Sequence, residues 1–230
     1  MRIGIICAMS EELKTLYDAL QHGRTVNIRG IKFYVGKIGT QPVVLVKSGI
    51  GKVQAGLTAA IMIVRFQPSV VINSGSAGGI GSGLSVGDLV VSTGTAYHDV
   101  DVTTSGYQYG QLPNQPLVFK ASPKWEDLIV NSSRAVGLNA KKGLIVSGDQ
   151  FVASQSADQK ILKRFPSALA CEMEGAAIGQ VAHQFRTPYV VIRAMSDVGN
   201  GQAEVSFDKF IVTAGKRSAQ MLLNLCNRLS

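Results

Sequence analysis

Short apolar runs, each followed by glycines, acids or hydroxyl residues, are the feature that most limits how this 230-residue sequence can fold. The runs include residues 2–8 (RIGIICA), 70–73 (VVIN) and 190–195 (VVIRAM), and segments with helical spacing separate them through the second half of the chain. This alternation predicts an α/β fold with a largely parallel sheet that is covered by helices on both faces. Because no internal repeat or linker divides the sequence, we expect a single domain over residues 1–230.

Local patterns predict where individual elements begin and end. Ser10 is expected to cap a helix whose apolar stripe includes Leu13 and Leu20. The glycine-rich residues 74–79 are expected to form a loop after a buried strand. Residues 103–123 are polar, contain Gly and Pro and show no period, which predicts a long loop of a kind that is often functional.

Six of the apolar runs end in residues that can bind a ligand. In open α/β sheets, ligands bind beyond the carboxyl ends of the strands, so these residues are expected to meet in one pocket. They are residues 9–12, 48–51, 74–79, 148–151, 172–174 and 196–197. Glu12, Glu174 and Asp197 bring carboxyl groups from three separate runs, and such groups can divide acid and base roles. Taken singly, Glu12 fits better as an ordinary acid at the start of a helix, and Asp197 or Glu174 could be a turn-forming or helix-terminal acid.

Composition and spacing argue against several other classes of protein. The net charge is +8, but the 23 Lys and Arg residues are scattered without a basic stripe, so we expect a solvated surface and no nucleic-acid partner. No stretch approaches the roughly 18 apolar residues of a membrane span. The three cysteines and three histidines lack metal-ligand spacing, so we expect no metal and no cofactor. An odd cysteine count without a pattern fits a reducing compartment, and we expect a cytoplasmic protein.

The stretch SGIGK at residues 48–52 has part of the pattern of a phosphate-binding loop, but it does not match that motif. Val46 stands where the first glycine should be, and Val53 replaces the Ser or Thr that would follow the lysine. The glycines that follow residue 74 do not form G-x-G-x-x-G in any register. A nucleotide-phosphate site is therefore poorly supported.

Taken together and in order, these blocks resemble one known family. They are GIICAMSEE, KSGIGKV, INSGSAGGI, VGDLVVS, YHDVDVT, GYQYGQLP, GLIVSGDQF, CEMEGAAI and VIRAMSDV. The chain resembles the bacterial 5′-methylthioadenosine/S-adenosylhomocysteine nucleosidases of the nucleoside phosphorylase superfamily. The resemblance implies a single-domain three-layer α/β fold, with a central twisted mixed sheet flanked by helices, and a homodimer. It also implies small-molecule 5′-thioadenosine substrates and a place in methionine salvage.

The resemblance implies an activity and assigns residues to it. Water would cleave the N-glycosidic bond, releasing adenine and 5-methylthioribose or S-ribosylhomocysteine. Glu12 matches the general base, Asp197 the general acid that protonates adenine N7, and Glu174 the acceptor for the ribose hydroxyls. The other implied substrate-binding residues are Met9, Ile50, Ser76, Gly78, Phe151, Val152, Met173, Arg193 and Phe207. The residues implied to reach the 5′ pocket of the partner subunit are Val102, Ser105 and Pro113.

Two positions depart from related sequences, and two roles stay open. Asn73 stands where related phosphorylases carry a phosphate-binding Arg, which favours water as the nucleophile. Ser105 replaces an aromatic residue of many family members and weakens the case for tight apolar packing of the thioalkyl group.

Arg193 interrupts a buried run, so it could contact the substrate site or pair with an acid in the core. For Glu172, which matches no family role, a structural salt bridge is expected.

Three functions compete on the sequence alone. The first is the hydrolase described above. The second is a phosphorylase, or a nucleosidase for another 5′-modified adenosine such as 6-amino-6-deoxyfutalosine. The third is a non-catalytic protein that binds adenine nucleosides, in which Glu12 or Asp197 should be missing. Both residues are present, which ranks this third reading last.

Overall fold

The computed structural model describes residues 1–197 and 203–229, with the side chains of 203–211 and 214 outside the description. The strands are β1 (Ile3–Cys7), β2 (Gln21–Ile28), β3 (Ile31–Ile38), β4 (Gln41–Lys47), β5 (Val70–Gly79), β6 (Leu89–Tyr97), β7 (Phe119–Lys120), β8 (Ala140–Ser147), β9 (Ala168–Glu172) and β10 (Tyr189–Asp197). The helices are α1 (Ser10–Asp18), α2 (Lys52–Phe66), α3 (Pro123–Ala135), α4 (Gln155–Arg164), α5 (Gly175–Gln184) and α6 (Ala203–Arg228).

The strands form one mixed sheet in the order β10-β6-β8-β9-β5-β1-β4-β3-β2, with β7 attached to β6. An additional pairing of β10 with β5 closes the strands β5, β10, β6, β8 and β9 into a ring. Among the described residues, five strand pairings are parallel and five are antiparallel. The expectation of a largely parallel sheet was therefore too strong, and the mixed sheet implied by the resemblance is confirmed.

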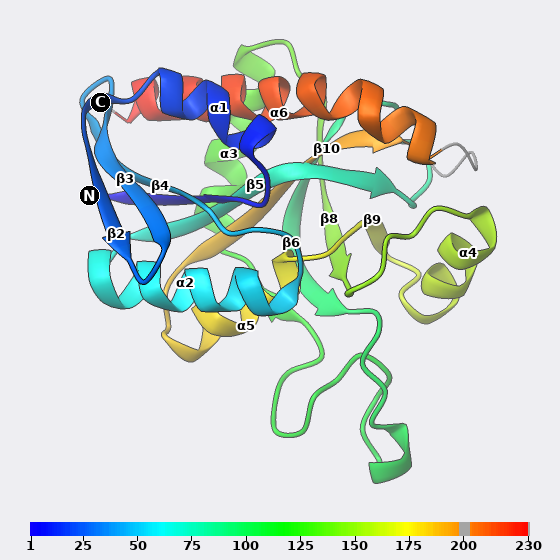
Figure 1. Cartoon of the computed structure of the whole chain (residues 1–230). Coiled ribbons are helices and arrows are strands. Elements are labelled where there is room, and N and C mark those ends of the chain that lie inside the picture. Colours follow the sequence, from blue (N-terminus) through cyan, green and yellow to red (C-terminus); the bar gives the residue numbers. More distant parts are fainter. Residues whose placement is uncertain (198–202, 230) are drawn as a thin grey trace.

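Helices cover the sheet on both faces. Figure 1 shows α1 and α6 along one face and α2 beside α5 along the other, with the strands between them. Every residue of β1 and of β10 is buried, because both faces of these strands are covered. The fold is thus the predicted α/β arrangement of a twisted mixed sheet between layers of helices. None of the helices in the described ranges is both long and apolar enough to cross a membrane.

Two local predictions were wrong. The N-cap of α1 is Met9 and not Ser10, because the carboxylate of Glu12 accepts the Met9 N–H at 3.1 Å and closes the helix end. The hydroxyl of Ser10 instead accepts a hydrogen bond from Lys47 Nζ. Residues 74–79 are not a loop, since β5 continues to Gly79 and pairs with β9 and β10 there. The small residues of this strand let acidic side chains approach its backbone, as described below.

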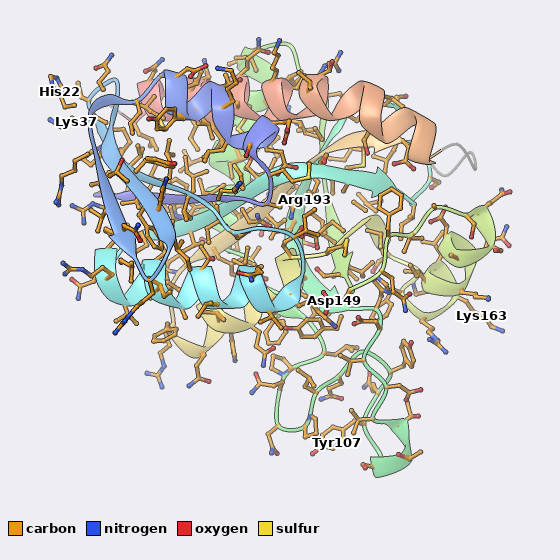
Figure 2. All side chains as sticks on the ribbon, in the orientation of Figure 1. His22, Lys37, Tyr107, Asp149, Lys163 and Arg193 are labelled. Carbon is orange, nitrogen blue, oxygen red and sulfur yellow. The ribbon has the colours of Figure 1, made fainter. Side chains whose placement is uncertain are left out.

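The predicted long loop is present and extends away from the sheet. It contains a single 3₁₀ turn, η1 (Thr103–Ser105), and the two-residue strand β7 before α3 begins at Pro123. Figure 1 shows this segment reaching well beyond the layers, and Tyr107 lies near its far end in Figure 2. The hydrogen bonds of residues 102–115 join partners within residues 100–115, such as Thr103 Oγ1 to Asp101 at 2.7 Å.

Candidate active site

A cavity of about 360 Å³ lies where six strands end. Residues that follow or terminate β1, β4, β5, β8, β9 and β10 line it, as the sequence predicted for the carboxyl ends of the strands. Those among the predicted site residues are Met9, Glu12, Ile50, Ser76, Gly78, Phe151, Val152, Met173, Glu174 and Asp197. The volume suits a small organic molecule.

Glu12 is held at the cavity wall by four hydrogen bonds. Its Oε2 accepts the backbone N–H groups of Ala8 and Met9, each at 3.1 Å. Its Oε1 accepts the Ser76 N–H at 3.0 Å and the Ser76 hydroxyl at 3.1 Å. These four hydrogen bonds fix the orientation of the Glu12 side chain, and a carboxylate held in place at a cavity wall is a candidate general base.

Because Gly75 has no side chain, the carboxylate of Glu12 can lie against the backbone of β5. A Cβ atom at this position would lie 2.7 Å from Glu12 Oε1, closer than any unstrained contact. The absence of a side chain in the middle of β5 therefore lets the carboxylate lie directly against the strand. This close approach explains why a strand that borders the cavity is rich in glycine.

Glu174 is a second buried carboxyl group in the same cavity. The N–H of Gly51, at the start of α2, donates to its Oε1 at 2.8 Å, and Arg193 Nη2 lies 3.6 Å from its Oε2. Burial and the neighbouring charge of Glu172 raise the pKa of Glu174 from 4.5 to about 7, against the lowering effect of Arg193 and Gly51. The group can therefore change its protonation state near neutral pH.

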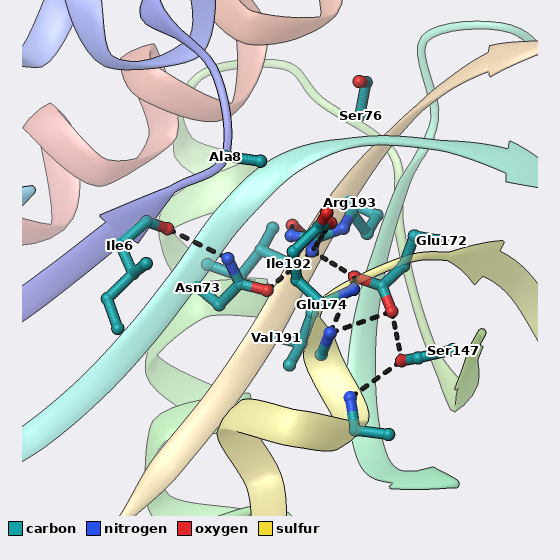
Figure 3. A network of polar contacts seen from close by, with 12 residues as sticks. Ile6, Ala8, Asn73, Ser76, Ser147, Glu172, Glu174, Val191, Ile192 and Arg193 are labelled. Atoms are coloured by element: carbon teal, nitrogen blue, oxygen red, sulfur yellow. Dashed lines mark hydrogen bonds and ion pairs between the residues drawn. The ribbon is translucent and has the colours of Figure 1, made fainter. Parts of the chain in front are cut away.

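A buried polar network lies behind the cavity (Figure 3). The carboxylate of Glu172 pairs with Arg193 and accepts the N–H of Gly175 at 2.9 Å and the hydroxyl of Ser147. Arg193 also donates to Asn73 Oδ1 at 2.6 Å. Arg193 is not among the residues that line the cavity, and it pairs with the buried acid Glu172, which is one of the two alternatives that the sequence left open. Glu172 forms the salt bridge expected of it.

Two backbone N–H groups of the SGIGK segment donate to carboxylates of this chain. At the N-terminus of α2, the N–H of Gly51 donates to Glu174 and the N–H of Lys52 donates to Asp149 Oδ1 at 2.9 Å. The Lys52 ammonium group pairs with Asp99 at 2.6 Å and lies 3.7 Å from Asp149, which is labelled in Figure 2. Side chains of this protein thus occupy the anion-binding end of the helix.

Phe151, Val152 and Asp197 also line the cavity. Asp197 ends β10 and is buried, and the hydroxyl of Ser196 donates to its Oδ1 at 3.2 Å. Gly78 of β5 lies beside this carboxyl group, since a Cβ at Gly78 would be 3.5 Å from Asp197 Oδ1. Phe151 is half exposed and offers an aromatic face to a flat ligand. The cavity therefore brings together the carboxyl groups of Glu12, Glu174 and Asp197 and the aromatic ring of Phe151.

Comparisons with known proteins identify the family. A sequence model of the phosphorylase superfamily matches residues 2–227. A solved S-adenosylhomocysteine nucleosidase from Streptococcus pyogenes, in complex with 5-methylthiotubericidin, is 43% identical with a TM-score of 0.95, over 100% of this chain and 98% of that one. A 5′-methylthioadenosine/S-adenosylhomocysteine nucleosidase from S. pneumoniae is 46% identical with a TM-score of 0.94, over 100% of both chains.

The chain belongs to the phosphorylase superfamily, among its methylthioadenosine/S-adenosylhomocysteine nucleosidases. A futalosine hydrolase mutant from Helicobacter pylori has the same fold, with a TM-score of 0.94 over 99% of both chains, but is only 30% identical. The superfamily membership confirms the resemblance drawn from the sequence motifs.

Some residues predicted for this nucleosidase site lie elsewhere or cannot be placed. Arg193 lies behind the wall, and its predicted part in ordering a water molecule stays a prediction. Val102, Ser105 and Pro113 belong to the extended segment and do not line the cavity of their own chain. Phe207 lies on α6, but its side chain is outside the described residues.

The structure adds cavity residues that sequence reasoning missed. Asp158, on α4, is the most notable, because it places a further carboxyl group in the wall of the nucleosidase cavity. Its sequence signal was only that of an acid in the first turn of a helix, where acids are common. Ala8, Ile80 and Cys171 also lie outside the segments that the sequence predicted for the cavity. Ala77, Gln150, Glu172 and Ser196 lie within those segments but had no predicted role in substrate binding.

Proposed function

We propose that this protein hydrolyses the N-glycosidic bond of 5′-methylthioadenosine and S-adenosylhomocysteine. The products would be adenine and 5-methylthioribose or S-ribosylhomocysteine. The observation that carries the proposal is one cavity that holds Glu12, Glu174 and Asp197 in a chain 43% and 46% identical to nucleosidases named for these substrates.

The proposed chemistry divides the reaction among the carboxyl groups of the cavity. Glu12 takes a proton from water, whose oxygen forms a bond to C1′ of the ribose as the bond from C1′ to N9 breaks. The electron pair of that bond passes to adenine, and Asp197 donates a proton to N7. Glu174 accepts hydrogen bonds from the ribose hydroxyls beside the positive charge that develops on the sugar. The half-exposed ring of Phe151 supports stacking on the base.

Water is proposed as the nucleophile in preference to phosphate. Asn73, where related phosphorylases have an Arg, is fully buried and donates to the Ile6 carbonyl at 3.0 Å while it accepts from Arg193. The N-terminus of α2 is already engaged with Glu174 and Asp149. Neither group is therefore available to a phosphate ion.

We also propose that the protein is a cytoplasmic homodimer that acts in methionine salvage. Exposed apolar side chains on neighbouring helices support self-association, with Val53, Leu57 and Val64 on α2 and Phe185 directly after α5. The extended segment that carries Val102, Ser105 and Pro113 would reach the 5′ pocket of the partner subunit. Light scattering on a gel-filtration column tests this, since Val53→Asp should shift a dimer towards monomer and a monomeric wild type would refute it.

The hydrolase proposal is tested by adenine release from 5′-methylthioadenosine. We expect turnover by the wild-type protein and a loss of at least about 100-fold in kcat for Glu12→Gln and for Asp197→Asn. Adenine binding, measured by calorimetry, separates lost chemistry from lost folding. A wild-type protein that binds the nucleoside without cleaving it would instead support the non-catalytic binding protein.

A further inference from the structure

Ser147 and Glu172 are two buried polar residues to which the proposed chemistry gives no part. Ser147 ends β8 and is fully buried, and Glu172 ends β9 with only 7% of the residue exposed. Burial of a hydroxyl group and of an ion-paired carboxylate costs free energy that an apolar strand end would avoid. The hydrogen bonds of the two residues lead to the start of α5, where Glu174 lies.

Glu174 is the N-cap residue of α5, but its side chain makes no capping hydrogen bond within the described residues. A helix commonly begins with a residue whose own side chain accepts one of the first free N–H groups. The Glu174 carboxyl group instead lines the cavity and accepts the Gly51 N–H at 2.8 Å. The cap of α5 therefore has to come from other side chains.

Glu172 and Ser147 accept the three N–H groups at the start of α5. Glu172 Oε2 accepts the Glu174 N–H at 3.1 Å, and both Glu172 oxygens lie 2.9 Å from the Gly175 nitrogen. Ser147 Oγ accepts the Ala176 N–H at 2.7 Å and donates its own proton to Glu172 Oε1. The ends of β8 and β9 thus cap the helix, which leaves the Glu174 side chain to the cavity.

The hydroxyl group of Ser147 fixes the Glu172 side chain from one side. Figure 3 shows the Glu172 carboxylate between this hydroxyl and the guanidinium group of Arg193. Because the hydroxyl donates to the carboxylate and accepts from the helix, it joins the two in one geometry. Its loss would leave the Ala176 N–H without this acceptor and would release one side of Glu172, which frees the backbone of Glu174 to shift.

We propose that Ser147 is a positioning residue that acts through Glu172 to hold Glu174 in place for the ribose hydroxyl groups. This inference rests on the proposed function, because it takes the ligand to be a ribonucleoside whose hydroxyl groups donate to Glu174. A hydroxyl–carboxylate hydrogen bond needs a separation of about 2.5–2.7 Å, so a small shift of the acceptor weakens it. Ser147 is not among the described residues that line the cavity, and it contributes to ribose recognition without touching the substrate.

The test measures discrimination between two substrates. Discrimination is the ratio of kcat/KM on 5′-methylthioadenosine to kcat/KM on the same nucleoside without its 2′ and 3′ hydroxyl groups. Both values come from one protein sample, so any misfolded fraction cancels, and the intrinsic reactivities of the two substrates are common to all variants. Assays at pH 8 keep Glu174 ionised, because its pKa is about 7. Relative to wild type, discrimination should fall about 10- to 100-fold in Glu174→Ala and about 10-fold in Ser147→Ala.

Two further variants complete the comparison. Ser133→Ala is the matched control, because Ser133 is an equally buried serine whose hydroxyl donates to the Ile129 carbonyl at 2.8 Å within α3. Its discrimination should stay within about twofold of wild type. Glu172→Gln keeps the size of the side chain but removes one acceptor oxygen from the start of α5, so it should lose discrimination as Ser147→Ala does. If Ser147→Ala yields no folded protein, wild-type discrimination in Glu172→Gln would refute the inference.

The outcomes separate this inference from the proposed function. If Glu174→Ala loses discrimination while Ser147→Ala keeps it, the inference is overturned and the proposed role of Glu174 stands. If Glu174→Ala keeps wild-type discrimination, the role of Glu174 fails and the inference fails with it. If the wild type cleaves neither nucleoside, hydrolysis fails on its own. The ratio of the two dissociation constants, measured by calorimetry, then replaces the ratio of kcat/KM values, with the same expected changes.

Discussion

Arg193 and Glu172 form an ion pair in which only 1% and 3% of the two side chains are exposed. The pair joins the middle of β10 to the end of β9, directly behind the cavity. Nη2 of the same guanidinium group lies 3.6 Å from Glu174 Oε2, so a single cation stabilises two buried carboxyl groups. This arrangement explains how the chain tolerates two glutamates at the end of a buried strand.

Replacement of Arg193 should destabilise the protein strongly. Arg193→Met leaves Glu172 buried without its cation, and loss of one partner of a buried pair costs about 3–5 kcal/mol. The free energy of unfolding in urea should fall by about that amount. The double variant Arg193→Met/Glu172→Gln removes the uncompensated charge and should recover part of the loss. A loss below about 1 kcal/mol for the single variant would show that the pair does not have this structural role.

The substitution Gly75→Ala should displace Glu12, the proposed general base, without a direct contact with the substrate. In Gly75→Ala the new Cβ would lie 2.7 Å from Glu12 Oε1, so the carboxylate must move away from the Ser76 donors. Because a misplacement of about 1 Å can cost 100-fold in rate, we expect kcat to fall by about that factor. Adenine affinity should change by less than about threefold. Wild-type kcat in this variant would argue that the position of Glu12 is not critical.

The raised pKa of Glu174 should make stability depend on pH. The folded protein binds this proton more tightly than the unfolded chain does, so the contribution of Glu174 to the free energy of unfolding falls as pH rises from 4.5 to about 7. Glu174→Gln cannot ionise and keeps an acceptor for the Gly51 N–H. Relative to wild type, the variant should therefore gain about 3 kcal/mol between pH 4.5 and pH 8. Parallel stability curves for the two proteins over this range would contradict the shift.

The fold class and most of the cavity could be predicted from the sequence because they depend on local patterns. Apolar runs that end in glycines and acids indicated six strand ends, and residues from all six line the cavity. The specific roles of Glu12, Glu174 and Asp197 came from the resemblance, because the pattern alone gave only an acid-rich pocket. The structure places the three residues in one cavity, and their individual roles stay predictions.

Other features depend on contacts between distant segments and could not be predicted. The sheet closes through the pairing of β5 with β10, whose residues lie about 120 positions apart in the chain. Gly75 can lie in a strand beside Glu12 because it has no side chain and so leaves room for the Glu12 carboxylate. No local sequence pattern predicts this contact between distant residues. Asp158 had the signal of an ordinary first-turn acid, and only the packing of α4 against the strand ends brings it to the cavity.

The central claim is that water, and not phosphate, cleaves the glycosidic bond, and one product analysis tests it directly. Purified protein is incubated with 5′-methylthioadenosine, with and without 50 mM phosphate. This phosphate concentration is about 50 times 1 mM, which is a usual upper value of KM for an enzyme substrate. Adenine release is followed while mass spectrometry identifies the sugar product. The account predicts the same rate in both conditions and 5-methylthioribose as the only sugar product. Release that requires phosphate and yields 5-methylthioribose 1-phosphate would contradict it.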